Sequence, residues 1–223
     1  MRYTKISLIF LLFVFAVFDV KAQKQIKEGI ATYSASYDIP ADQLQNYGAL
    51  PSVILIFFRD DSTAAIVNQG GAIIKGVSVL KTNYHSMIID IPNISKKILV
   101  VLTPAEVAQE NAEVPLFTAK ASMEKDVING YKCTKTVITD TKTGKEYDIW
   151  LTNDIDIAPN SVSRQVSNFG GVPVKFVTFN HGIKINAELL QIEEDTVAPG
   201  FFSATKDYLS MSYSELKNLY GGR

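Results

Sequence analysis

The chain is poor in the residues that carry most metal and redox chemistry. Its 223 residues include one cysteine, Cys133, and two histidines, His85 and His181. A zinc site needs three or four cysteine, histidine or carboxylate ligands at close spacing, so we expect no metal and no cofactor. One cysteine cannot form a disulfide within the chain, and burial alone must therefore hold the fold together.

The sequence also lacks an excess or a long run of positive charge. It has 22 basic and 23 acidic residues, a formal net charge of −1, and its longest basic run is Lys96-Lys97. Nucleic acids and anionic membrane surfaces are both bound through dense positive charge. We expect no nucleic-acid partner and no attachment to a charged membrane surface.

Motifs of known catalytic chemistry are missing as well. The sequence contains no G-x-S-x-G, no H-E-x-x-H and no S-x-x-K followed by K-T-G. Cys133 lies within an apolar-polar alternation, where a cysteine is ordinarily a small buried apolar residue. Acidic pairs such as Asp60-Asp61 fall where turns are expected. The sequence therefore predicts that the protein is not an enzyme.

The N-terminus has the organisation of a secretory signal peptide. Arg2 and Lys5 precede the unbroken apolar run Leu8–Phe18, and small residues end the segment at Ala22. A membrane-spanning helix needs about 20 apolar residues, more than this run supplies. We predict cleavage between Ala22 and Gln23, with an uncleaved anchor as the alternative. Residues 23–223 then form a single domain without a membrane anchor, exported to the periplasm or beyond the cell.

Most of the chain after residue 22 alternates between apolar and polar residues. Tyr33, Ala35 and Tyr37, for example, are separated by single serines. Such stretches, with short turns between them, predict a β-rich α+β domain, either a curled antiparallel sheet or an incomplete β-barrel of about eleven strands. The predicted strands are Ala31–Tyr37, Val53–Phe58, Ala64–Asn68, Ile73–Leu80, Ser86–Ile91, Lys97–Leu102, Leu116–Ala121, Tyr131–Thr139, Glu146–Thr152, Val172–Phe179 and Ile183–Ile192.

A few short helices are expected to cover the sheet. A capping box at Thr103 to Glu106, with proline at the first helical position, predicts a helix from about Pro104 to Glu113. A second box at Ser212 to Glu215 predicts a terminal helix reaching Tyr220. A weaker pattern suggests a third helix from Asn160 to Asn168.

Two segments carry a resemblance to a known family. Ile128–Lys135 reads I-N-G-Y-K-C-T-K, and Trp150–Ile155 reads W-L-T-N-D-I. This resembles the I-x-G-Y-x-C-x-K … W-x-T-x-x-I pattern of exported Bacteroidetes-type proteins of unknown function, which are distantly similar to the periplasmic lipoprotein carriers LolA and LolB. The resemblance implies an incomplete antiparallel barrel, with short helices over an apolar cavity and no catalytic residue. It also implies that Gly130 makes a turn and that Tyr131 and Cys133 point inward.

The apolar character of the strands suggests two functions. Few residues are predicted to be helical, so part of the sheet must close on its own core or remain as an open apolar face. In the first interpretation, the protein is a binding or carrier protein of the cell envelope that holds a lipid or a lipoprotein acyl chain. In the second, it is a ligand-free structural or interaction protein with an envelope protein as partner. Strand parity predicts the ligand wall residues Tyr33, Tyr37, Phe57, Ile73, Val77 and Phe176.

Overall fold

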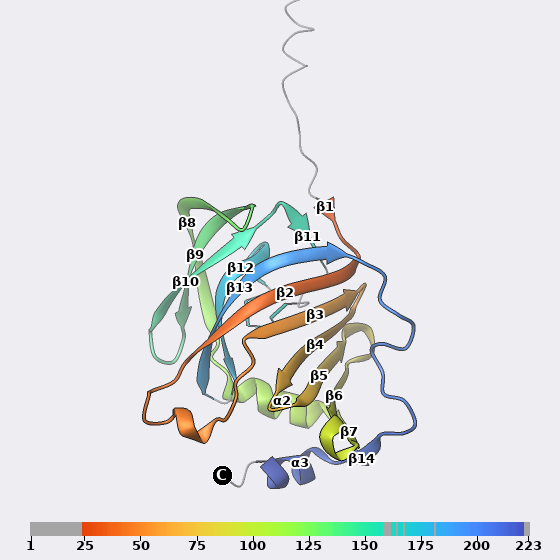
Figure 1. The fold of residues 1–223 in the computed structure, drawn as a ribbon. Coiled ribbons are helices and arrows are strands. Elements are labelled where there is room, and N and C mark those ends of the chain that lie inside the picture. Colours follow the sequence, from red (N-terminus) through yellow and green to blue (C-terminus); the bar gives the residue numbers. More distant parts are fainter. Residues whose placement is uncertain (1–23, 158–161, 164, 167, 181, 221–223) are drawn as a thin grey trace, which may run out of the picture.

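A computed structural model describes residues 24–157, 162–163, 165–166, 168–180 and 182–220 (Figure 1). Within them, one large sheet dominates. Its strands in spatial order are β14 (Leu209–Met211), β7 (Lys96–Leu102), β6 (Tyr84–Ile91), β5 (Ala72–Val79), β4 (Ser62–Gln69), β3 (Val53–Arg59), β2 (Glu28–Asp38), β13 (Ile183–Glu194), β12 (Val172–Asn180), β10 (Glu146–Thr152), β9 (Tyr131–Asp140) and β8 (Phe117–Ile128).

The twelve-stranded sheet is open and almost entirely antiparallel, which confirms the predicted fold class. Only β14 joins it in parallel, beside β7. Because β14 and β8 stand at opposite edges and do not pair with each other, the sheet curls without closing. Two further strands, β1 (Lys24–Gln25) and β11 (Ile155–Asp156), pair in parallel as a separate short ribbon.

The strands that the sequence did not predict are the shortest ones. β1, β11 and β14 have two or three residues each, too few to show an alternation. β8 is twelve residues long, whereas the alternation predicted only Leu116–Ala121. It lies at an edge with most of its residues exposed, so its second half carries no apolar pattern.

Two α-helices are present among the described residues, α2 (Pro104–Glu113) and α3 (Tyr213–Tyr220), both as predicted. The capping box of α2 is formed: the Thr103 backbone N–H donates to Glu106 Oε2 (2.7 Å), and the Glu106 N–H donates to Thr103 Oγ1 (3.3 Å). Single 3₁₀ turns occur at η2 (Leu44–Asn46), η3 (Leu80–Thr82) and η4 (Pro92–Ile94).

The predicted helix at 160–168 is wrong for the residues that can be judged. Residues 162–163, 165–166 and 168 adopt bend, turn or irregular backbone, and residues 160, 161, 164 and 167 lie outside the described part of the chain. The predicted signal peptide and its cleavage site, residues 1–23, lie outside it as well. Over the described ranges, no helix is long and apolar enough to span a membrane.

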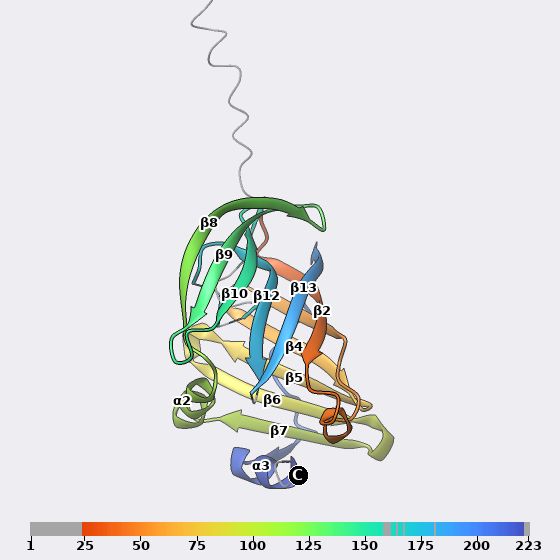
Figure 2. The same cartoon turned by 90° about the vertical axis from the view of Figure 1, so that its left-hand side faces the viewer.

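Among the residues that the structure describes, buried apolar side chains form three clusters. The largest lies where β2, β3, β13, β12, β10 and β9 curl toward one another, and Tyr33, Ile138 and Leu189 are fully buried there. The second lies between β5 to β7 and the helices α2 and α3, and the third between β3 to β7 and the chain before β14. Figure 2 shows α2 and α3 beside β7, while β8 arches over the opposite end.

The close approach of β2 and β13 depends on a glycine. A Cβ atom placed on Gly29 would lie 2.2 Å from the backbone oxygen of Glu193 and 3.2 Å from the ring of Phe58. No side chain fits in that space. Gly29 therefore lets the central strands pack tightly against the largest cluster.

Candidate functional site

The strands β3 to β7 have two faces with different surroundings. We call the face that carries Ile56 and Phe58 the inner face, and the face that carries Phe57 and Val77 the outer face. Ile56 and Phe58 belong to the largest cluster, whereas Phe57 and Val77 belong to the third. Strand pairing shows that Val100, buried in the second cluster, also lies on the inner face.

Between the first and second clusters, the inner face of the sheet carries small residues, which we call its floor. Ala65 on β4 pairs with Gly76 on β5, and both are exposed. No atom lies within 4 Å of a Cβ placed on Gly76, so the space above it is open. The row continues to buried Ile56 on one side, and through Met87 to buried Val100 on the other. The two clusters therefore border an uncovered strip of sheet.

Partly buried apolar side chains accompany this floor. Val67 and Ile74 form the next cross-strand pair on the same face, and Met87 lies beside Gly76. We call Ala65, Val67, Ile74, Gly76 and Met87 together the inner lane. It is apolar and open at its floor, which is the character of a surface that accepts an apolar ligand.

The helix α2 borders the second cluster but buries little of itself. None of its residues is buried, and Val107 is its partly buried contact with the cluster. A polar link ties it to α3, since the Tyr213 hydroxyl donates to Glu110 Oε1 at 2.6 Å. Burial, together with this carboxylate, raises the pKa of Tyr213, so the hydroxyl keeps its proton.

Three of the six predicted wall residues lie on the inner side of the sheet. Tyr33 and Phe176 are both buried in the largest cluster, where their rings meet edge to face with centroids 5.7 Å apart. The Tyr33 hydroxyl donates to the Pro173 backbone oxygen (2.8 Å). Tyr37, on the same face of β2, is half-buried, and its hydroxyl donates to the Pro51 oxygen (2.8 Å).

The other three lie on the outer face. Phe57 and Val77 pack together in the third cluster, and Ile73 is 42% exposed on the same face of β5. The six residues therefore do not form one wall. Parity within a strand cannot relate its faces to those of the next strand, because a shift of one residue in register exchanges the two faces.

The sequence analysis missed Ala65 and Gly76. The available signal was Ala65 in β4 and Gly76 in β5, two small residues in strands that also carry larger β-branched residues. Its meaning depends on the pairing of Ala65 with Gly76, which places two small residues side by side. That pairing follows from the strand register, which the sequence pattern alone does not specify.

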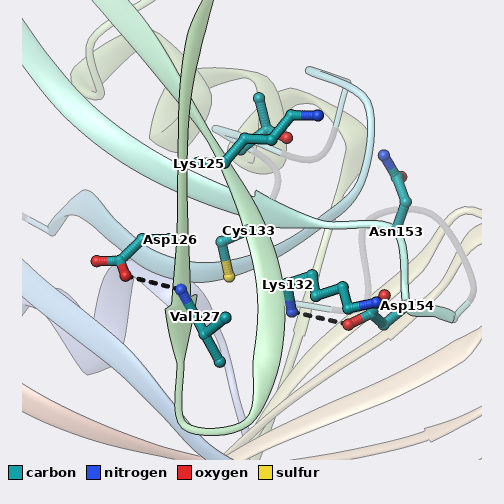
Figure 3. A pocket seen from close by; sticks show the side chains of 8 residues that line it. Lys125, Asp126, Val127, Lys132, Cys133, Asn153 and Asp154 are labelled. Atoms are coloured by element: carbon teal, nitrogen blue, oxygen red, sulfur yellow. Dashed lines mark hydrogen bonds between the residues drawn. The ribbon is translucent and has the colours of Figure 1, made fainter.

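A hollow lies at the β8–β9 hairpin, with a volume of about 490 Å³ (Figure 3). Its lining mixes apolar surface with charged and amide groups: the Lys132 backbone N–H donates to Asp154 Oδ2 (2.7 Å), and the Val127 N–H donates to Asp126 Oδ1 (2.7 Å). The residues that line it are Lys125, Asp126, Val127, Lys132, Cys133, Thr134, Asn153 and Asp154.

The two segments that resemble the exported family meet at this hollow, and their contacts are structural. Asn129 and Gly130 both have positive φ, as a two-residue hairpin turn requires. Cys133 is 2% exposed. Thr152 is fully buried, and its hydroxyl donates to the Lys132 oxygen (2.8 Å). The expected turn at Gly130 and the burial of Cys133 are thus observed.

The Cys133 thiol is held in an unreactive form. Burial raises the pKa of the Cys133 thiol, and nearby Asp154 and Asp126 raise it further, so the thiolate is disfavoured. The His85 ring is buried, with Nε2 3.3 Å from Asn83 Oδ1. His181 lies outside the described residues. Over the part of the chain that the structure describes, no three histidine, cysteine or acidic residues gather as a metal site.

Comparison with known proteins supports the fold alone. No protein-family model and no curated relative matches the chain. The solved structure of PNGF-II in a C2 space group is similar, with a TM-score of 0.51 and 16% sequence identity. The match covers 87% of this chain and 33% of that one, so this chain spans about a third of the length of PNGF-II. At 16% identity, this likeness shows only that the two backbones follow a similar path.

Proposed function

We propose that this chain is an exported binding protein of the cell envelope that holds an acyl chain on the inner lane. The observation that carries the proposal is the exposed Ala65–Gly76 floor between two buried clusters. An apolar strip of this kind is costly to leave in water, and a ligand that covers it removes the cost. Each methylene buried there contributes about 0.8 kcal/mol.

A binding role also agrees with the state of the reactive groups. The buried, protonated Cys133 is a poor nucleophile, because burial and the carboxylates of Asp154 and Asp126 raise the pKa of its thiol. We therefore propose that the protein binds its ligand without chemical change. The signal-peptide pattern of residues 1–22 supports export, and the Ile128–Lys135 resemblance supports a distant kinship with the LolA and LolB carriers.

The test is to fill the lane. Gly76 has an ordinary strand backbone and open space above it, so Gly76→Trp is compatible with the fold. Calorimetric titration with dodecanoate should show binding to the wild-type protein. The variant should bind at least about tenfold more weakly, as the loss of two buried methylenes would cause. Ser36→Trp, at an exposed position on β2 away from the lane, is the matched control and should bind normally.

One observation favours the second function, an envelope interaction protein. The free edge strand β8 and the residue before it expose three large apolar side chains: Leu116 is 63%, Met123 96% and Val127 64% exposed. An unpaired edge can accept a strand from another protein. Failure of the wild-type protein to bind dodecanoate would reject the acyl-binding proposal and leave this edge as the stronger candidate.

A further inference from the structure

The strand register arranges the inner face as parallel cross-strand rows of different polarity. One row is apolar, with Val67, Ile74 and Ile89 paired in succession on β4, β5 and β6. The next row along the strands contains Ala65, Gly76 and Met87. The side chains of these two rows are all apolar.

The third row along the same strands is polar. Thr63 on β4 pairs with Ser78 on β5, and Ser78 pairs with His85 on β6. Thr63 and Ser78 are half-buried, and His85 is buried with its Nε2 3.3 Å from Asn83 Oδ1. Two hydroxyls and an imidazole thus lie in line at one end of the lane, where β3 turns into β4 and β5 connects to β6.

The lane is therefore polarised along the strands. From the apolar row to the polar row is four residues, which is about 13 Å at about 3.3 Å per residue. A hydrocarbon chain placed over the polar row would remove water from the Thr63 hydroxyl without replacing its hydrogen bond, which is unfavourable. A head group with hydrogen-bonding oxygens replaces that water.

We propose that the lane binds a single-chain amphiphile in one orientation. The tail lies over Val67 and Ile74, and the oxygen-bearing head group lies at Thr63, Ser78 and His85. This inference rests on the proposed acyl-binding function and adds the direction of the ligand and the nature of its polar end. A carboxylate or another oxygen acceptor fits the Thr63 hydroxyl as its donor.

The test separates the head from the tail. Thr63→Val removes the hydroxyl and keeps the shape of the side chain. It should weaken dodecanoate binding about tenfold, the effect of one lost hydrogen bond to a charged group. It should change the binding of dodecane, which has the same chain and no head group, by less than about twofold. Thr32→Val, also half-buried but on β2 and facing away from the lane, is the control and should change neither.

A tail-end variant completes the test. Ile74→Ala should weaken dodecanoate and dodecane to a similar extent, because both chains cover that position. The proposed orientation is overturned if Thr63→Val leaves dodecanoate binding unchanged, or weakens both probes equally. If wild-type protein binds neither probe, the acyl-binding function itself fails. If it binds both probes and Thr63→Val does not weaken dodecanoate more than dodecane, only the proposed orientation fails.

Discussion

The outer and inner faces of β3 to β7 belong to the same strands, yet one is covered and the other is open. On the outer face, Phe57, Val77 and Ile88 lie beneath residues 197–208, which we call the strap. On the inner face, the lane around Ala65 and Gly76 has nothing over its floor. Phe57, Val77 and Ile88 are large side chains, whereas the open floor of the lane is made of the small residues Ala65 and Gly76.

The strap is held by three cations from alternate strands. Arg59 on β3 and Lys75 on β5 donate to backbone oxygens of the strap, at 3.0 Å and 2.9 Å, and Lys97 on β7 donates to Asp207 (2.7 Å). Each cation also lies over an aromatic ring of the strap. The pairs are Arg59 with Phe202, Lys75 with Phe201 and Lys97 with Tyr208.

The two faces therefore differ in how their apolar surface is shielded from water. On the outer face, the chain supplies its own aromatic cover, the strap, and fastens it with the cations Arg59, Lys75 and Lys97. Lys75 illustrates the cost, because desolvation beneath the strap lowers the pKa of its ammonium. On the inner face, Ile74 and Met87 pack against the second cluster, and no described atom lies within 4 Å of a Cβ placed on Gly76.

The largest expected effect comes from removing part of the cover. Phe202 is 7% exposed in the third cluster, so Phe202→Ala should lower the free energy of unfolding by about 3 kcal/mol. Urea unfolding would measure the loss. Leu209→Ala, at a 58% exposed position after the strap, should cost less than about 1 kcal/mol. Equal costs for the two variants would show that the strap contributes little to the core.

A smaller effect should appear at acidic pH. The Lys97 ammonium and the Thr205 hydroxyl hold the pKa of Asp207 at about 2, below its ordinary 3.8. Because the folded-state pKa is the lower one, this contact stabilises the fold fully above about pH 4. The stabilisation is lost as the pH falls toward 2.

Urea midpoints of wild type and Asp207→Asn, measured from pH 6 to pH 2, would test this contact. The wild type should exceed the variant at pH 6, and the difference should shrink between pH 4 and pH 2. A difference that stays constant over this range would mean that the Asp207 carboxylate does not fasten the strap.

The sequence predicted the local features well because their signals are local. The capping box at Thr103 located the start of α2, and Asn129-Gly130 makes the turn that the motif implies. The open antiparallel sheet followed from alternation and turn spacing. The lane could not be predicted, since it exists only once Ala65 and Gly76 are paired across two strands. For the same reason, the predicted wall residues Phe57 and Val77 lie on the opposite face, under the strap.

The most direct test of the account is to map where an acyl chain lies. A dodecanoate analogue with a photoreactive diazirine near its methyl end would be bound to the protein, irradiated, and located by peptide mass spectrometry. The account predicts saturable labelling of β4 and β5 at Val67 and Ile74, suppressed by excess dodecanoate. Labelling confined to the β8 edge or the strap, or labelling that excess dodecanoate does not suppress, would contradict the claim that the inner lane is the binding site.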